Sequence, residues 1–362
     1  MTMEELPLGA IRVRSWSRGC ALCWKGAKLV LFVTGKCPLY DRCPYCTISN
    51  WRRGKDLVVV NELTVHEDEE ILKEAELISA LGAGITGGEP SLVPEKVAHY
   101  TRLLKERFGN QFHIHMYTNA IGINERSLDM LADAGLDEIR FHTWDKRLWS
   151  RITLALDMGF VVGAEMPAIP GQGWVKALEE LASFLDRIGA SFMNLNELEF
   201  TPSNRQKLLS MDFMPREDSD VAVYGSREAA IEVLEFIEKE TSISGYFCPA
   251  AQKEYQVRMR WARRACNVAR SYEMPTDEGT LIFGEIKGPP EVLKDLVARY
   301  GGYLEGGRLL IDVYKFHEIA NQLRSMGLEA RLLEVMPTDD RRILQVYPLD
   351  YVIREDRRHE RD

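Results

Sequence analysis

The sequence has no apolar run of about 18 residues, the length that a membrane-spanning helix needs. Its first residues, 1–7, also lack the basic and apolar parts of a secretory signal peptide. No unit of fixed length repeats along the chain, which argues against solenoid and propeller architectures. These absences predict a cytoplasmic protein that makes no contact with a membrane.

Acidic residues outnumber basic ones, and the formal net charge is −9, but the charge is unevenly spread over the 362 residues. Residues 1–60 carry ten Lys or Arg against four Asp or Glu, and residues 253–270 carry six against one. An anionic partner such as RNA or a nucleotide can therefore bind locally in spite of the net charge. A solvated helix face is the simpler explanation for the second basic segment.

The seven cysteines supply the strongest chemical signal in the chain. In the cytosol thiols stay reduced, so metal binding is expected rather than disulfides. Three of them, Cys37, Cys43 and Cys46, directly follow an apolar run at 29–33 that predicts a buried strand. Loops at the carboxyl ends of such strands bind ligands. Three thiolates there can hold an iron–sulfur cube and leave its fourth iron open, although a zinc knot completed by a distant ligand is an alternative.

From residue 29 to residue 241, short apolar runs alternate with longer amphipathic ones. This alternation is typical of βα units around a parallel sheet. The predicted strands are 29–33, 83–86, 112–118, 138–142, 160–165 and 191–200. The predicted helices are 69–81, 95–108, 125–134, 148–158 and 174–188. Several of them are expected to end at a glycine, namely Gly82, Gly109, Gly135, Gly159 and Gly189.

The chain is expected to divide into five parts. An N-terminal segment, 1–28, carries a Cys-x-x-Cys pair and precedes the βα core of 29–241. A segment rich in cysteine and arginine, 242–277, follows where the βα pattern stops. Residues 278–353 show a β-α-β-α-β-β pattern and predict a small α+β domain. The mixed-charge tail 354–362 has nothing to bury and is expected to be disordered.

A second motif follows the second predicted strand. The sequence Gly87-Gly88-Glu89 stands at the carboxyl end of that strand, one βα unit after the cysteine loop. Two adjacent glycines let backbone groups approach a ligand without an intervening β-carbon. Such an edge suits the zwitterionic end of an amino acid.

The cysteine loop after the first strand, Gly87-Gly88-Glu89 after the second and six βα units together resemble a radical S-adenosylmethionine (SAM) enzyme over residues 29–241. The resemblance implies an α/β fold: a partial or complete (β/α)6 radical SAM barrel with a cysteine-rich clasp and a small C-terminal α+β domain. It also implies a [4Fe–4S] cluster that cleaves SAM reductively. The resulting 5′-deoxyadenosyl radical abstracts hydrogen from a substrate. Within the superfamily, the chain is similar to archaeal-type proteins grouped with pyruvate formate-lyase activating enzymes.

By this resemblance, Cys37, Cys43 and Cys46 ligate the cluster, and Tyr45 lies beside the adenine of SAM. The residues of Gly87-Gly88-Glu89 hold the methionine amino group. Five residues separate the first two cysteines here, whereas three is the commonest spacing in the family. The longer gap bears on the subfamily more than on the cluster.

The resemblance assigns further cofactor contacts to the third and fifth strands. Thr118 and Asn119 end the third strand as in the family's Thr-Asn-Gly, but Ala120 replaces the glycine. Glu165 lies in the family's fifth-strand adenine region, one residue earlier than usual. These three side chains, Thr118, Asn119 and Glu165, are the remaining cofactor-binding candidates.

Four cysteines are left over, namely Cys20, Cys23, Cys248 and Cys266. Four thiolates make a complete tetrahedral site, and a second iron–sulfur cluster or a zinc ion are both possible occupants. Unrelated buried cysteines are the third alternative.

Polar residues at strand ends are candidates for a wall that faces the substrate: His142, Asn194, Asn196 and Glu197. Buried polar groups without partners destabilise a protein, so a plain strand would not carry them. His113 and His115 share one face of the third strand and are either structural or in contact with the cofactor.

The expected activity is SAM cleavage followed by hydrogen abstraction, with ferredoxin or flavodoxin as the electron donor. An anionic substrate, RNA or a nucleotide-like cofactor precursor, is preferred because of the basic segments. The enzymatic alternative is activation of a partner protein. The non-enzymatic alternative is a zinc protein that binds nucleic acid, which would have no use for Gly87-Gly88.

Overall fold

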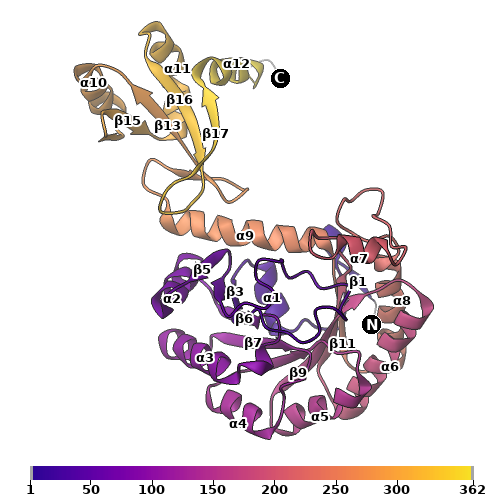
Figure 1. Ribbon diagram of the computed structural model, residues 1–362. Coiled ribbons are helices and arrows are strands. Elements are labelled where there is room, and N and C mark those ends of the chain that lie inside the picture. Colours follow the sequence, from indigo (N-terminus) through magenta and orange to yellow (C-terminus); the bar gives the residue numbers. More distant parts are fainter. Residues whose placement is uncertain (1–2, 360–362) are drawn as a thin grey trace. The chain divides into compact units, whose positions relative to one another are not determined.

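A computed structural model describes residues 3–359, and the chain divides into two units (Figure 1). The first unit extends to Glu76 and resumes over Ala80–Gln256; the second comprises Leu77–Ser79 and the chain from Val257 onward. The boundary lies inside helix α9 (Ala250–Val268), not at 241 or 277 as the sequence pattern predicts. The sequence does not reveal this boundary, because α9 continues across it without a change in composition. None of the helices in residues 3–359 has both the length and the apolar character needed to cross a membrane.

Seven parallel strands form the centre of the first unit. In spatial order they are β3 (Lys28–Phe32), β6 (Gly82–Thr86), β7 (His113–Thr118), β8 (Glu138–Phe141), β9 (Val161–Ala168), β10 (Phe192–Glu197) and β11 (Ser244–Cys248). Six of them match the predicted strands. The seventh, β11, was not predicted because its residues stand where the βα pattern stops.

The larger helices of this unit lie outside the curved sheet (Figure 1). They are α2 (Asp68–Leu77), α3 (Pro94–Phe108), α4 (Glu125–Asp133), α5 (Ser150–Asp157), α6 (Gln172–Ile188) and α8 (Ser226–Glu240), and the short helix α7 (Arg205–Leu209) follows β10. Gly189 ends α6 with φ 78°, as predicted. The prediction for Gly82 is wrong: Gly82 begins β6, where a β-carbon would stand 2.4 Å from the carbonyl of His113.

Antiparallel strands flank both edges of the parallel sheet. The pair β1 (Glu4–Glu5) and β2 (Ile11–Val13) adds to β11, while β4 (Val58–Val60) and β5 (Leu63–Val65) add to β3. No pairing between β3 and β11 occurs among residues 3–359, so the barrel is partial. Residues 1–28 were expected to form a separate segment, but β2 belongs to the sheet.

Helix α1 (Arg18–Trp24) packs against β3, β6 and β7 inside the curve of the sheet (Figure 1). The close approach of α1 to β7 depends on Gly19, because a β-carbon at this position would stand 2.7 Å from Nδ1 of His115. The Cys-x-x-Cys segment is thus part of the barrel interior.

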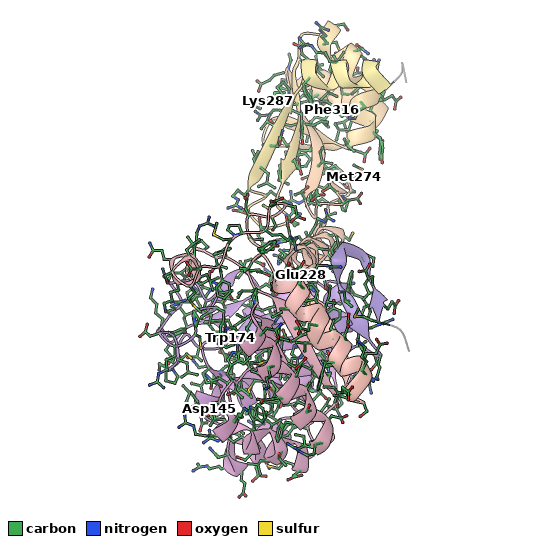
Figure 2. The ribbon with its side chains drawn as sticks, turned by 90° about the vertical axis from the view of Figure 1, so that its right-hand side faces the viewer. Asp145, Trp174, Glu228, Met274, Lys287 and Phe316 are labelled. Atoms are coloured by element: carbon green, nitrogen blue, oxygen red, sulfur yellow. The ribbon has the colours of Figure 1, made fainter. Side chains whose placement is uncertain are left out.

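The described part of the second unit contains an antiparallel sheet, the C-terminal part of α9 and three further helices. Its strands are β12 (Met274–Pro275), β13 (Leu281–Lys287), β14 (Tyr303–Glu305), β15 (Arg308–Ile311), β16 (Glu329–Val335) and β17 (Ile343–Pro348). The three further helices are α10 (Pro290–Tyr300), α11 (Val313–Ser325) and α12 (Leu349–His359). The predicted β-α-β-α-β-β order is present, with β12 and β14 added. Phe316, labelled in Figure 2, lies in an apolar core between helices and sheet.

The prediction that the chain is disordered from residue 354 is wrong for residues 354–359. Helix α12 continues to His359 because Leu349, Val352 and Ile353 at its start are buried in the core of the second unit. A helix anchored over its first turns can continue into a charged segment. Residues 360–362 of the predicted tail lie outside the described residues.

Candidate active site

A cavity of about 800 Å³ opens at the carboxyl ends of the parallel strands. Its walls include the three cysteines of the predicted cluster loop, Cys37, Cys43 and Cys46, and the motif Gly87-Gly88-Glu89. This is the end of the sheet at which βα folds bind ligands. The structure thus brings both sequence motifs to one cavity.

The three thiols of the loop are free and partly exposed. Burial raises the pKa of Cys37 to about 11, and burial also raises the pKa of Cys43. Without a cation these groups therefore remain protonated at neutral pH. Within residues 3–359 the three sulfur atoms do not form a set with mutual distances under 4.8 Å, whereas the ligand atoms of a tetrahedral zinc lie about 3.7 Å apart. The loop is thus not preformed for a single zinc ion.

The glycine pair supports the cysteine loop directly. The N–H of Gly88 donates to the carbonyl of Thr34 (2.6 Å), and the N–H of Glu89 donates to the carbonyl of Lys36 (2.8 Å). A β-carbon on Gly88 would stand 2.4 Å from the Lys36 oxygen, and one on Gly87 would stand 2.7 Å from the Thr34 oxygen. These glycines therefore have a structural role besides the predicted ligand contact, because they let the loop lie against β6.

Glu89 joins this loop to the end of β7. Its buried carboxylate accepts from the hydroxyl of Thr118 (2.5 Å), the N–H of Asn119 (2.6 Å) and the N–H of Ser91 (3.0 Å). Burial raises the pKa of Glu89, although these hydrogen bonds favour the charged form. The Asn119 amide lies 3.7 Å from the sulfur of Cys37 and donates to it. The Ser91 side chain also hydrogen-bonds this carboxylate, so four donors fill its roughly four acceptor positions.

The residue after Asn119 shows why glycine is usual there. Ala120 has φ 73°, in the left-handed region that favours glycine, and its carbonyl accepts from the guanidinium of Arg151 (2.6 Å). The turn is thus retained with alanine at some backbone strain.

Aromatic side chains form a second wall. The ring centroids of Tyr45 and His142 are 5.4 Å apart, and Tyr45, Trp144 and Trp174 pack against one buried apolar cluster that includes Phe200. Burial lowers the pKa of His142, so its neutral ring donates from Nδ1 to the carbonyl of Glu165 (2.7 Å). This wall is suited to an aromatic base, and the contact of Tyr45 with adenine stays a prediction.

The floor of the cavity is charged. Burial by itself would raise the pKa of Glu165, but the charges of Arg140 and Lys28 and a hydrogen bond from Asn196 lower it to about 2. Oε2 of Glu165 lies 2.8 Å from Arg140, and its Oε1 accepts from the Asn196 amide at 3.1 Å. Glu165 is therefore ionised at neutral pH and is not a proton donor. Lys28 and Tyr117 also line the cavity; the alternation of side chains along β3 and β7 could have revealed them.

Two of the four predicted wall residues, His142 and Asn196, line the cavity. Asn194 lies outside the lining and donates to Glu165 and to the sulfur of Cys20 (3.2 Å each). The carboxylate of Glu197 accepts from Arg216 (2.6 Å) and from the first N–H of α9 (2.7 Å). Glu197 is therefore a structural residue that joins β10 to α9.

Three of the remaining cysteines belong to the first unit. Cys20 and Cys248 are members of one cluster around Tyr246, and the thiol of Cys23 donates to Oε1 of Gln256 (2.7 Å). Burial raises the pKa of Cys248. Cys266 is exposed and belongs to the second unit. A second metal site made by all four cysteines stays a prediction.

The profile of the radical SAM superfamily matches residues 31–143. A protein of Methanocaldococcus jannaschii with the provisional name glycyl-radical enzyme activating enzyme is 39% identical over 278 residues, which cover 74% of this chain and 72% of the relative. The chain belongs to the radical SAM superfamily. Within it, the relative places this radical SAM enzyme in an activating-enzyme-like branch.

Three solved structures of radical SAM proteins also match. SuiB of Streptococcus suis aligns with a TM-score of 0.44 at 16% identity, over 62% of this chain and 50% of SuiB. TsrM of Kitasatospora setae aligns with a TM-score of 0.37 at 11% identity, over 74% of this chain and 58% of TsrM. Coproporphyrinogen III oxidase of Escherichia coli aligns with a TM-score of 0.38 at 11% identity, over 85% of this chain and 79% of the oxidase. The chain spans about half the length of the first of these.

Proposed function

We propose that Cys37, Cys43 and Cys46 hold the [4Fe–4S] cluster of this radical SAM enzyme and that the adjoining cavity holds SAM. One observation carries the proposal: three free thiols and Gly87-Gly88-Glu89 border the same cavity of about 800 Å³. When bound, the cluster and SAM supply a 5′-deoxyadenosyl radical through one-electron reductive cleavage of SAM. Ferredoxin or flavodoxin is the proposed electron donor, and seven free thiols suit a reducing cytoplasm.

The protein's own residues have binding and positioning roles in this proposal. Glu89 fixes the backbone of Asn119, whose amide donates to Cys37. The negative charge of Glu89, together with the backbone of Gly87 and Gly88 at the cavity, would attract the ammonium group of SAM. Tyr45 and His142 supply the wall for the adenine, and the apolar cluster behind Tyr45 limits the access of water to the cavity.

We further propose that the substrate is a partner protein that becomes a glycyl-radical enzyme. The provisional name of the M. jannaschii relative supports this choice. The preference for RNA or a nucleotide rested on two basic segments. In the second of them Arg260 and Arg264 are buried, and Nε of Arg264 donates to the carbonyl of Pro337 (2.8 Å), so these two arginines are used within the fold.

For Cys20, Cys23, Cys248 and Cys266 we propose a second iron–sulfur cluster, with zinc as the alternative. Three of these residues belong to the first unit, and Cys20 and Cys248 share one cluster of side chains. Metal analysis of a triple alanine variant of Cys37, Cys43 and Cys46 distinguishes them: residual iron supports the cluster, and the absence of residual iron contradicts it.

The decisive experiment replaces one thiol. Cys43→Ala in anaerobically reconstituted protein is expected to reduce the yield of 5′-deoxyadenosine from SAM and dithionite to background. Lys55→Ala is the matched control, because this exposed lysine lies in the same loop. If the Cys43 variant still cleaves SAM, the assignment of the cluster loop is wrong.

A separate experiment tests the partner. The reduced enzyme is mixed anaerobically with SAM and a purified glycyl-radical protein from the same organism, and electron paramagnetic resonance is expected to show a glycyl radical. If 5′-deoxyadenosine forms but no protein radical appears, the partner proposal is wrong and the SAM chemistry stands.

A further inference from the structure

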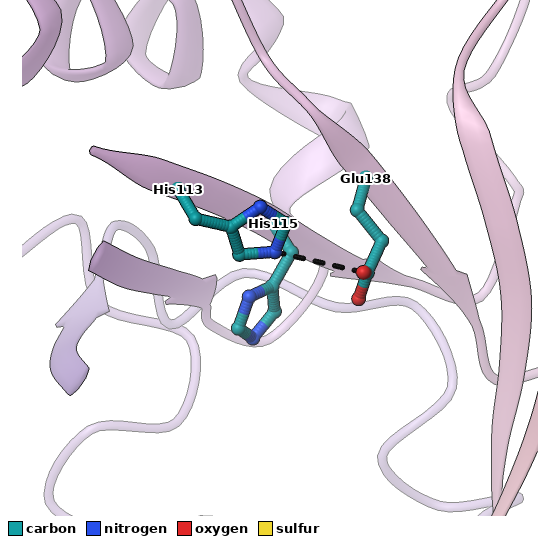
Figure 3. A group of neighbouring side chains, drawn as sticks. All are labelled: His113, His115 and Glu138. Atoms are coloured by element: carbon teal, nitrogen blue, oxygen red, sulfur yellow. Dashed lines mark ion pairs between the residues drawn. The ribbon is translucent and has the colours of Figure 1, made fainter. Parts of the chain in front are cut away.

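Three buried side chains gather at the amino ends of β7 and β8, at the opposite end of the strands from the cavity. His113 begins β7, Glu138 begins β8, and His115 lies two residues along β7 (Figure 3). They are 4%, 1% and 0% exposed, respectively. One ligand atom from each lies within 4.8 Å of the other two, and no other such group occurs among residues 3–359.

Nδ1 of His115 has no hydrogen-bond partner, and Nε2 of His113 is paired with Oε2 of Glu138 at 3.5 Å, a long distance for such a pair. A buried polar atom left without a partner costs about 1–3 kcal/mol. A cation bound among the three side chains would pair with both nitrogens and with the carboxylate.

The outer atoms of both imidazoles face groups that can orient them. Nε2 of His115 lies within hydrogen-bond distance of the hydroxyl of Tyr117 (3.2 Å), whereas Nδ1 of His113 lies 3.9 Å from Oδ2 of Asp137, close enough for charge attraction but too far for a hydrogen bond. A hydrogen-bonding group behind the outer nitrogen is typical of histidines that ligate metals, because it fixes the ring and its tautomer. Gly19 of α1 has no side chain beside Nδ1 of His115, where a β-carbon would stand 2.7 Å away.

The third side chain is oriented in the same way. Nε of Arg140 donates to Oε1 of Glu138 (2.6 Å), which leaves Oε2 directed toward His113. The positive charge of Arg140 opposes a nearby cation, but Glu165 also pairs with this guanidinium at 2.8 Å. Two carboxylates therefore share one arginine, and Glu138 can accept a second positive partner.

A hollow of about 360 Å³ adjoins the group. Its walls include His113, Asp137, Glu138, Trp16 and Ser17. The hollow offers an ion a route from the surface and provides room for a water molecule.

We propose that His113, His115 and Glu138 bind one Zn²⁺ ion, with a water molecule from the hollow as the fourth ligand. Two imidazoles, one carboxylate and one water form a tetrahedral zinc site with one open position. The ligand atoms of such a site lie about 3.3 Å apart, so the two rings must turn inward from their present positions. The ion would join β7 to β8 beside α1, away from the cavity.

The experiment uses protein whose cysteine sites are loaded with iron, prepared without zinc and then titrated with Zn²⁺ or Co²⁺. Glu138→Gln retains the size of the ligand but removes its charge, and His113→Ala removes a nitrogen. His66→Ala, at an exposed histidine, is the matched control. Iron content and circular dichroism verify that each variant keeps its clusters and fold.

Wild-type protein is expected to take up one zinc per chain without losing iron, and Co²⁺ is expected to give weak visible bands without a thiolate charge-transfer band. Glu138→Gln should weaken Zn²⁺ binding by about 100-fold or more, because removing a residue that only orients a metal ligand already lowers metal affinity by about 10–100-fold. His66→Ala should bind normally. The proposal fails if wild type takes up no zinc, if uptake persists in both variants, or if cobalt shows thiolate ligation. If His113→Ala does not fold, the Tm values of the other two proteins decide. Zn²⁺ should raise the Tm of wild type but not that of Glu138→Gln.

Discussion

The interior of the barrel contains paired charged side chains, whereas the core of the second unit is mainly apolar. Arg140, Glu138 and Glu165 are charged and lie in the barrel interior, where they pair with one another. The second unit instead buries aliphatic and aromatic side chains around Phe316, and its buried Glu285 pairs with Arg308 and Arg331, whose side chains are 43% and 31% exposed.

This difference separates two uses of burial. An apolar core gains free energy from each side chain that leaves water. Buried ion pairs contribute little net stability, because removing charges from water costs about as much as their attraction returns. A barrel that keeps Arg140, Glu165 and Lys28 beneath a ligand cavity is therefore organised around fixed charge. The second unit is organised for stability.

The largest expected effect comes from removing Arg140. In Arg140→Met two buried carboxylates, Glu138 and Glu165, lose their shared cation, which should destabilise the first unit by about 3–5 kcal/mol. Arg331→Met is the matched change in the second unit and should cost about 1 kcal/mol or less, since Glu285 keeps Arg308. Denaturant titration read by hydrogen exchange measures each unit separately. Equal losses in the two variants would contradict the comparison.

A smaller effect is expected from an apolar substitution of similar size. Asn194→Leu removes hydrogen bonds to Glu165 and Cys20 and should destabilise the barrel by about 1–3 kcal/mol. Leu323→Met in the core of the second unit should cost about 1 kcal/mol or less, because that core tolerates a change of shape at constant volume. The same denaturation measurement applies. A barrel that is stabilised by Asn194→Leu would show that its polar interior is dispensable.

The smallest effect concerns pH. Burial lowers the pKa of His142 in the folded protein, so below about pH 6.5 the unfolded chain binds the proton more readily. The stability of the first unit should therefore fall as the pH drops from 7 to 5, and His142→Gln should make this dependence shallower. The second unit has no histidine among its described buried residues and serves as the internal control. An unchanged slope in the variant would assign the pH dependence to other groups.

The regular elements of the barrel could be predicted from the sequence because each one is long enough to show its period. Strand β6 and helix α3 begin within one residue of the predicted ranges 83–86 and 95–108. Strands β1, β2, β4 and β5 have only two or three residues and show no period. Helix α1 was not predicted either, since its position depends on Gly19 and on partners far along the chain.

The candidate site was predicted in part for the same reason. Cys37, Cys43, Cys46 and Gly87-Gly88-Glu89 are local motifs, and their strands place them at one cavity. Glu197 was assigned to the wall because the sequence could not show its partners, Arg216 and the start of α9. The convergence of His113 and His115 with Glu138 depends on the register between β7 and β8, which the sequence does not state.

The sequence by itself determined the βα succession, the cysteine loop and the class of chemistry, because periodicity and short motifs are properties of neighbouring residues. Only the tertiary structure decided that the barrel is partial, that α1 lies inside the curve of the sheet, and which buried charges pair. Those features depend on strand order and on contacts between residues a hundred or more positions apart, such as Arg140 with Cys20. Contacts of that kind form only when the whole chain folds.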